Sequence, residues 1–224
     1  MSLLRKGAIR PLRSYINYAL SFDGIDDYVK VPYSTSLDFT DELTMECWIK
    51  RTSDITLRPD QTPLGKDITY WWYMFLHTNT PWAVLWNTNG DNYIAQAPSE
   101  LPLNTWAHFA ATFKRNDKAV AYLNAEAGIP LATLDFPLGT DTNDIGIGYI
   151  AIDSQYFEGS IYEVRLYNRA LSASEILHNK NAKTPVLNGL VLWLPINEGV
   201  GTTAHDKSGQ GNNATVYGAT WVRR

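Results

Sequence analysis

The chain has 224 residues and a formal net charge of −4, from 19 basic and 23 acidic side chains. This balance provides no basic surface for nucleic acid or anionic lipid, so we expect neither as a partner. No stretch is long and apolar enough to span a bilayer, so we expect no membrane insertion. Eight Trp, thirteen Tyr and seven Phe supply the large apolar area of a well-packed β protein.

Residues 1–17 are predicted to form a basic N-terminal arm ahead of the folded domain. Arginine, lysine and proline interrupt the segment that would have to be apolar in a signal peptide. We therefore expect no signal peptide in this chain.

Short apolar runs separated by turn residues then follow one another along the chain. Glycine, asparagine and aspartate between the runs tolerate left-handed backbone and so favour turns. This regular punctuation is typical of a sandwich or a barrel rather than of alternating strands and helices. The predicted strands are 18–23, 27–31, 43–50, 70–77, 82–87, 92–97, 106–114, 118–124, 129–135, 145–150 and 159–167, with two or three more after Gly189.

The single cysteine, Cys47, lies in one of these runs, LTMECWIK. One cysteine excludes an intrachain disulfide. Cys47 alternates with Met45 and Ile49, and this period of two predicts a thiol buried in the core.

One segment, Ser172 to Asn181, is predicted to be helical. It opens S-A-S-E, in which Ser172 can cap the helix and Glu175 can reach back to complete a capping box. The helix is expected to pack across one end of a sandwich through Leu171, Ile176 and Leu177.

Three stretches of the sequence resemble motifs of one known family. They are ALSFDGIDDYVKVP at 19–32, FEGSIYEVRLYNRALSASEILHN at 157–179, and GLVLWLPINEGVGTTAHDKSGQGNNATVYGATWV at 189–222. All three are similar to motifs of laminin-G-like domains in the concanavalin A-type lectin/glucanase superfamily. The resemblance implies an all-β fold, a two-sheet antiparallel β-sandwich of the jelly-roll type, with one short helix near 172–181.

The order of these motifs differs from the order in the family. Its members ordinarily carry the GLVLW stretch before the ALSFDG stretch, whereas here it comes last. Only about thirty residues follow this motif, too few for a second sandwich. We therefore predict a single sandwich over residues 18–224, with residues 189–224 completing it in cis as a circular permutation or pairing in trans with a neighbouring subunit.

The family pattern also bears on a structural calcium ion. Where the family has I-D-E-V, this chain has Ile161, Tyr162, Glu163 and Val164, so an acidic residue often available to calcium is a tyrosine. Asp206, in DKSGQGNN, is retained, but its simplest role is to accept backbone N–H groups in a glycine-rich turn. We expect no required cofactor, leave a structural calcium open, and assign no metal ligand.

Catalytic patterns are absent from the sequence. Glucanases of this fold place two carboxylates on one strand about 5 Å apart, facing one cleft, and no such arrangement occurs. Glu42 and Glu46 share a strand face but lie too far apart for this chemistry. The four histidines are scattered, and His108 is predicted to be a satisfied or surface side chain. We predict that the protein is not an enzyme, and a glycoside hydrolase is the weakest alternative.

An aromatic stretch at 70–93, YWWYMFLHTNTPWAVLWNTNGDNY, is the strongest candidate for a binding site. Strand alternation places the odd-numbered residues from Trp71 to His77 on one face and the even-numbered residues from Tyr70 to Leu76 on the other. One face must be core, and sugar rings can stack on the other while polar side chains bind their hydroxyl groups. The candidate ligand-binding residues are Trp71, Trp72, Trp82, Trp86, Asn87, Asn89, Asp91 and Tyr93.

The alternative interpretation of these residues is structural. Each tryptophan taken alone is better explained as core, and each loop asparagine or aspartate as a turn former. Taken together, the indoles are too many for the core alone, and an exposed apolar patch of several hundred Å² usually marks a binding or subunit contact.

We interpret the chain as a non-catalytic recognition or adhesion module that binds a polysaccharide or glycoconjugate. Its expected context is a larger surface assembly at an extracellular or virion surface. The alternative is a purely structural virion or cell-surface decoration subunit with no sugar site, whose partners are copies of itself or other subunits.

Overall fold

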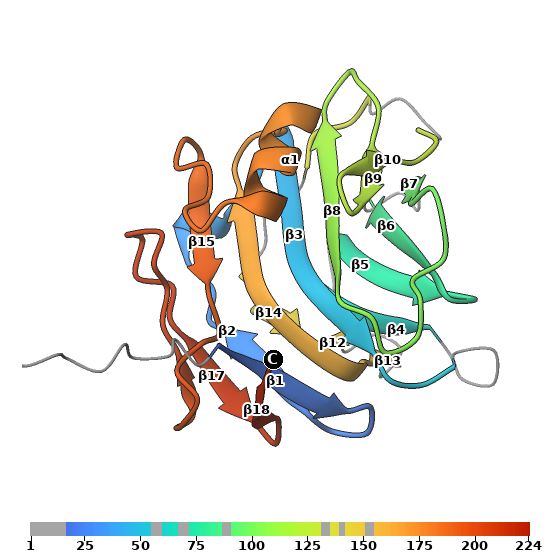
Figure 1. Ribbon diagram of the computed structural model, residues 1–224. Coiled ribbons are helices and arrows are strands. Elements are labelled where there is room, and N and C mark those ends of the chain that lie inside the picture. The colour runs from blue at the N-terminus through green and yellow to red at the C-terminus, as the bar shows by residue number, and fades with distance from the viewer. Residues whose placement is uncertain are drawn as a thin grey trace, which may run out of the picture.

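Two antiparallel sheets of eight strands pack face to face in the computed structural model of the protein (Figure 1). The structure describes residues 17–54, 60–66, 72–86, 91–130, 135–138, 142–150 and 155–224. Every strand pair is antiparallel in this part of the chain. The predicted all-β, two-sheet sandwich with one short α-helix is confirmed.

The first sheet, called sheet A, has the strand order β10-β9-β8-β3-β14-β1-β18, and β15 also pairs with β14. Its strands are β1 (Tyr18–Asp23), β3 (Glu42–Arg51), β8 (Ala107–Lys114), β9 (Val120–Leu123), β10 (Glu126–Ala127), β14 (Glu158–Tyr167), β15 (Leu190–Leu194) and β18 (Thr220–Arg223).

The second sheet, called sheet B, has the strand order β16-β17-β2-β11-β4-β5-β6-β7. Its strands are β2 (Tyr28–Val31), β4 (Gln61–Lys66), β5 (Trp72–His77), β6 (Thr80–Trp86), β7 (Asn92–Gln96), β11 (Ile145–Ile147), β16 (Thr203–Ala204) and β17 (Ala214–Tyr217). A separate hairpin is formed by β12 (Tyr149–Ile150) and β13 (Gln155–Tyr156), and a short 3-10 helix by Thr35–Leu37.

The core fills the space between the sheets because side chains alternate along each strand. In β3, Met45, Cys47 and Ile49 point inward and are fully buried. This confirms the predicted core thiol. β5 has the same period, with buried residues at every second position from Trp72 to Leu76.

One central strand, β4, is not among the predicted strands. Its sequence, QTPLGK, holds a proline and a glycine, and both disfavour the interior of a strand. Pro63 lies where the register between β4 and β5 shifts. At Gly65 a Cβ atom would lie 2.5 Å from the Cβ of Tyr73 on β5, so the close approach of the two strands requires glycine. The neighbouring strands, rather than its own propensity, therefore hold β4 in the sheet.

Most of the other predicted strands agree with the structure to within a few residues where it describes them, but the predicted strand 145–150 is divided at Gly148 into β11 of sheet B and β12 of the separate hairpin. Residues 1–16 of the predicted arm, Tyr70, Trp71, Asn87 and residues 131–134 lie outside the described residues. Of the predicted strand 129–135, the described part forms only an isolated bridge between Pro130 and Ala95.

β5 and β6 are joined by a two-residue turn. Thr78 and Asn79 have φ of 47° and 69°, and His77 pairs directly with Thr80. Two successive left-handed residues match the twist of a tight hairpin and fix its register. As a result, Phe75 on β5 lies opposite Trp82 on β6.

The strands of residues 189–224 pair with strands from other parts of the same chain. β15 lies beside the second half of β14, and β1 lies beside the first half. β17 pairs with β2, and β18 pairs with β1. The C-terminal segment thus contributes strands to both sheets (Figure 1). A single domain over residues 18–224, with this segment in cis or exchanged in trans between copies, stays a prediction.

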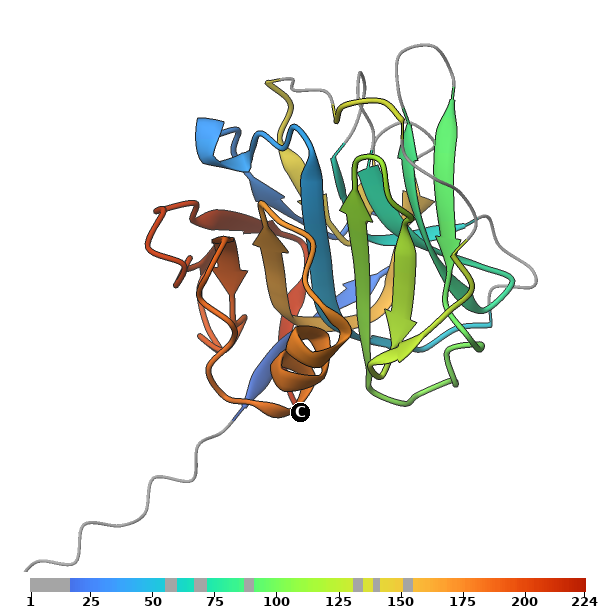
Figure 2. The same ribbon diagram turned by 90° about the horizontal axis from the view of Figure 1, so that it is seen from above.

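The helix α1 (Ala173–Asn181) lies on the outer side of sheet A (Figure 1 and Figure 2). The capping box of Ser172 and Glu175 is present, as predicted. Ile176 packs against Ala110 and other residues on the outer face of sheet A. The prediction that Leu177 packs inward is wrong, because the next residue of a helix is rotated by about 100° and Leu177 is 49% exposed. Among the described residues, no helix combines the length and apolar character that crossing a bilayer requires.

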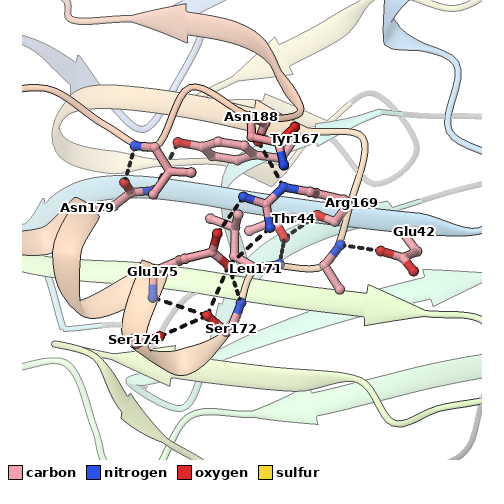
Figure 3. A network of polar contacts seen from close by, with 12 residues as sticks. Glu42, Thr44, Tyr167, Arg169, Leu171, Ser172, Ser174, Glu175, Asn179 and Asn188 are labelled. Atoms are coloured by element: carbon pink, nitrogen blue, oxygen red, sulfur yellow. Dashed lines mark hydrogen bonds and ion pairs between the residues drawn. The ribbon is translucent and has the colours of Figure 1, made fainter.

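A polar network ties the start of α1 to sheet A (Figure 3). Arg169 donates two hydrogen bonds to the carboxylate of Glu175, with N···O distances of 3.0 and 2.6 Å. Thr44 of β3 donates its hydroxyl to the carbonyl of Arg169 at 2.7 Å and accepts the N–H of Leu171 at 2.9 Å. The helix is therefore held by bonds to the sheet as well as by its buried side chains.

Candidate functional site

The outer face of sheet B carries aromatic side chains on β5 and β6. On β5, the residues that alternate with the buried ones, Tyr73, Phe75 and His77, point outward. β6 adds Trp82 opposite Phe75. This is the two-face arrangement that strand alternation predicts.

These four rings lie close enough to form one surface. The ring centroids of Tyr73 and Phe75 are 5.3 Å apart, and those of Phe75 and Trp82 are 6.3 Å apart. His77 meets Trp82 at 6.2 Å with the ring planes perpendicular. All three distances lie in the range of favourable aromatic pairs, about 4.5–7 Å. We call Tyr73, Phe75, His77 and Trp82 the aromatic strip.

Polar groups flank the aromatic strip. Nδ1 of His77 lies 2.8 Å from Oδ1 of Asp60, and the side chain of His77 is 53% exposed. Gln96 on β7 lies opposite Trp82 and is partly exposed. The indole Nε1 of Trp82 has no hydrogen-bond partner among the described residues. An apolar strip beside an imidazole, an amide and a carboxylate suits a ligand that has both C–H faces and hydroxyl groups.

Two of the predicted site residues belong to the core. Trp72 is 3% exposed and Tyr93 is 7% exposed. The hydroxyl of Tyr93 donates to the carboxylate of Asp135. Both side chains occupy inward positions of their strands, and this burial removes them from the candidate site.

The remaining predicted residues lie at the outer face or outside the described chain. Trp82 and Trp86 are half-buried on the outward face of β6, and Asp91 is exposed just before β7. The residues outside the described part are Trp71, Asn87 and Asn89.

A second aromatic group on the same side of the molecule was not predicted. Tyr28 on β2 stacks on Tyr217 of β17 with centroids 4.6 Å apart and lies 5.6 Å from Tyr149. Tyr149 stacks in turn on Tyr156 at 4.6 Å across the β12–β13 hairpin. These residues are distant in sequence, and the alternation of Tyr28 with Val29 was the only local signal of an outward tyrosine.

The carboxylates of β3 do not form a catalytic pair. Glu46 is fully buried, with Oε1 2.8 Å from Nη1 of Arg165, and Glu42 accepts the N–H of Ala170. Burial raises the pKa of Glu46, but contacts with His108 and Arg165 lower it by more, so its pKa lies below the ordinary value. A buried, ion-paired carboxylate has no access to a substrate.

His108 corrects a prediction. It is not a surface side chain, because it is fully buried, and its polar partner is the carboxylate of Glu46, with which it makes an ion-pair contact but no hydrogen bond among the described residues. Its Nε2 lies 3.5 Å from Oε2 of Glu46, and its ring packs 5.5 Å from that of Trp48. The residue lies beneath the outer face of sheet A rather than in a solvent-accessible site.

Asp206 has the predicted role of a turn acceptor. Its carboxylate accepts N–H groups from Trp193 at 2.9 Å, Ser208 at 2.8 Å and Asn212 at 2.9 Å. These bonds close the glycine-rich turn that follows β16 and account for the residue without a metal ion.

The turn between β1 and β2 gathers three carboxylates, Asp23, Asp26 and Asp27, within 4.8 Å. Asp23 accepts the N–H of Ile25 at 2.8 Å, and Asp27 accepts the N–H of Asp23 at 2.9 Å. Burial, and then the neighbouring carboxylates, raise the pKa of Asp27. Since calcium takes about six to eight oxygen ligands and these bonds already explain the turn, no ligand set is assigned.

The chain matches one protein family over most of its length. A family model described as the concanavalin A-like lectin/glucanases superfamily matches residues 23–177. The chain belongs to this superfamily. The matched range includes the aromatic strip and most of both sheets, and it confirms the resemblance of the sequence motifs. No curated protein matches this superfamily member.

Solved structures share the fold at low sequence identity. A proposed carbohydrate binding protein from Bacteroides ovatus has a TM-score of 0.73 and 20% identity over 93% of this chain and 60% of that chain. A heptameric SAP-like pentraxin from Limulus polyphemus has a TM-score of 0.58 and 14% identity, covering 94% of this chain and 93% of that chain. Domain 4 of a GH43 extracellular arabinanase from Geobacillus stearothermophilus, solved in complex with arabinotriose, has a TM-score of 0.56 and 18% identity, over 71% and 74% of the two chains.

These comparisons establish the fold. The superfamily member spans 60% of the length of the Bacteroides ovatus protein. At this low sequence identity the similarity concerns the fold, and the ligands named for those proteins are not thereby ligands of this chain.

Proposed function

We propose that this superfamily member is a non-catalytic recognition or adhesion module that binds a polysaccharide or glycoconjugate. The observation that carries this proposal is the aromatic strip, four rings in contact on the outer face of one sheet with polar groups beside them. The C–H faces of a sugar pack on the rings, and the polar side chains bind its hydroxyl groups.

The fold and the remaining site residues support the same ligand class. Proteins of this fold include a proposed carbohydrate binding protein and an arabinanase domain solved with arabinotriose. Trp86 lies on the outward face of β6, the strand that also carries Trp82 of the aromatic strip, and Asp91 is exposed just before the neighbouring strand β7. Trp71, Asn87 and Asn89 lie outside the described residues and belong to the proposal as predictions from the sequence.

The carboxylates on β3 are not free to act as a catalytic pair. Glu42 and Glu46 on β3, the carboxylates closest to a catalytic spacing in the sequence, are engaged in the hydrogen bonds and ion pair described above. The outer face of sheet B presents aromatic rings together with Gln96, His77 and Asp60, and the proposal gives these polar groups the role of binding sugar hydroxyls.

Replacement of Trp82 by alanine tests the binding site. We expect Trp82→Ala to weaken retention on the preferred polysaccharide in affinity electrophoresis by about fivefold or more, because one well-placed ring contributes about 1 kcal/mol or more. Phe75→Ala should act in the same direction, and Phe75→Tyr should retain binding.

The matched control is Trp221→Ala. Trp221 is a half-buried indole on β18 of sheet A, and its Nε1 donates to the carbonyl of Gly201. Thermal unfolding of each variant separates a loss of binding from a loss of fold. If Trp82→Ala and Trp221→Ala bind every polysaccharide of the panel equally well, the aromatic strip is not the site.

We also propose that the module acts within a surface assembly, at an extracellular or virion surface. Size-exclusion chromatography with light scattering, combined with tryptophan fluorescence, distinguishes the module from its alternative. A species whose emission shifts with one polysaccharide supports the recognition module. A discrete oligomer that responds to no polysaccharide would favour a purely structural decoration subunit.

A further inference from the structure

A pocket of about 550 Å³ lies on the outer side of sheet A, on the opposite face of the sandwich from the aromatic strip. Its lining includes Trp48 on β3 together with Tyr162, Glu163 and Arg165 on β14, and residues 179–183 at the end of α1. Its volume is in the range of pockets that hold small ligands, about 300–1,000 Å³.

The lining of this pocket is cationic, although the whole chain carries a net charge of −4. Arg165, Lys180, Lys183 and Arg224 line the pocket, with Glu163 as the acidic residue among them. In the described part of the chain, Lys180, Lys183 and Arg224 make no ion pair. A concave surface lined by uncompensated charges of one sign concentrates ions of the opposite sign.

Glu163, the acidic residue of the pocket lining, does not repel an anion. Glu163 is compensated, because its Oε2 accepts from Nη2 of Arg165 and from Nε1 of Trp193. Arg165 is 1% exposed, and its Nε has no hydrogen-bond partner among the described residues. A buried cationic donor with spare capacity therefore lies among the lining groups.

Tyr162 occupies the position at which the family pattern carries an acidic residue. Its ring stacks on that of Trp48, with centroids 5.6 Å apart and planes 11° from parallel. Cζ of Arg224 lies 3.5 Å from the centroid of the same ring. The tyrosine therefore removes a negative charge from the pocket and also supports a cation through a cation–π contact.

We propose that this pocket binds an acidic sugar residue of the hexuronate class. Its carboxylate is held among Lys180, Lys183 and Arg224. Carboxamides donate and accept hydrogen bonds, as sugar hydroxyls do, so they suit the rest of the ring. The lining asparagines that reach the solvent-exposed part of the pocket are Asn17, Asn181 and Asn197.

The proposed site is independent of the aromatic strip and adds a second ligand class to the molecule. The strip offers apolar rings and neutral polar groups, whereas the pocket offers cations and amides. The two sites lie on different sheets, so variants of one are not expected to change binding at the other.

Isothermal titration calorimetry of the full chain with D-galacturonate tests the proposal. We expect saturable binding that weakens as sodium chloride is added, because the contact is ionic. Lys180→Gln combined with Lys183→Gln, and separately Arg224→Gln, should each weaken binding by about tenfold. Arg223→Gln and Lys118→Gln are matched controls, since both side chains are exposed and neither lines the pocket.

Two further ligands make the outcome decisive. D-Galactose, which lacks the carboxylate, should give no measurable binding at this site, and inorganic sulfate should bind more weakly than galacturonate. Equal binding of galactose, or an unchanged affinity in the pocket variants, would overturn the proposal. Sulfate that binds as tightly as galacturonate would show a general anion site and overturn the assignment to a sugar. Trp82→Ala should leave galacturonate binding unchanged, which separates this site from the aromatic strip.

Discussion

Arg165 compensates the buried carboxylate charge on the outer face of β3 and β14. Its two Nη atoms bind the carboxylates of Glu46 and Glu163, and Glu46 is fully buried. Arg165→Met leaves the Glu46 carboxylate without its main partner, so we expect a loss of about 3–5 kcal/mol in the free energy of unfolding. Urea unfolding followed by tryptophan fluorescence measures this loss.

Glu46, the other member of the ion pair with Arg165, provides the control. Glu46→Gln combined with Arg165→Met removes both opposite charges, so the double variant should be less destabilised than the sum of the two single variants. Strictly additive losses would show that the ion pair contributes nothing beyond the packing of its two side chains.

At the scale of an element, the start of α1 depends on one carboxylate. Hydrogen bonds from Arg169 are the largest cause that lowers the pKa of Glu175 from its ordinary value of 4.5 to about 2. Because the folded-state pKa lies below the unfolded value, this stabilisation is complete above pH 4.5 and is lost as the pH falls through about 2.

Glu175→Gln should therefore lower the thermal unfolding temperature at pH 7, and the difference from the native chain should shrink as the pH falls from 4.5 toward 2. Circular dichroism melts across this range measure the difference. A difference that is equally large at pH 7 and at pH 2 would contradict the assignment, whereas Glu126→Gln, at an exposed position on β10, should show little effect at any pH.

The elements also show how far local sequence predicts structure. Ser172 and Glu175 are three residues apart, and a capping box needs only those residues, so the start of α1 could be predicted. β4 could not, because Pro63 and Gly65 argue against a strand and only the neighbouring strands reveal the register shift and the close approach that admit them. Leu177 was misplaced because its burial depends on how the helix is rotated against sheet A.

At the scale of the whole molecule, residues 189–224 contribute strands to both sheets. If they pair in cis, deletion of Gly189 to Arg224 exposes the edges of β1, β2 and β14 and opens the core. We then expect the truncated chain to lose its cooperative thermal transition and its near-ultraviolet circular dichroism.

Light scattering on the full chain provides the independent readout. A monomer at micromolar concentration agrees with pairing in cis. A dimer, together with a truncated chain that stays folded and takes up the segment from a second copy, would show exchange in trans.

Neighbouring residues by themselves determined the class of the fold, the buried thiol of Cys47 and the separation of Phe75 from Trp72 onto opposite faces of one strand, whereas the tertiary structure decided which of these faces is outward. These properties depend on a period of two along a strand, or on hydrogen bonds that span a few residues, so the local sequence holds all of the information. Tertiary structure alone decided which aromatic rings share a surface and which cations share a pocket. Tyr28 and Tyr217 meet because β2 and β17 are paired, and Lys183 and Arg224 line one pocket because α1 and the end of β18 both lie at sheet A. Such proximity follows from strand order and packing between distant segments, and no short pattern in the sequence encodes it.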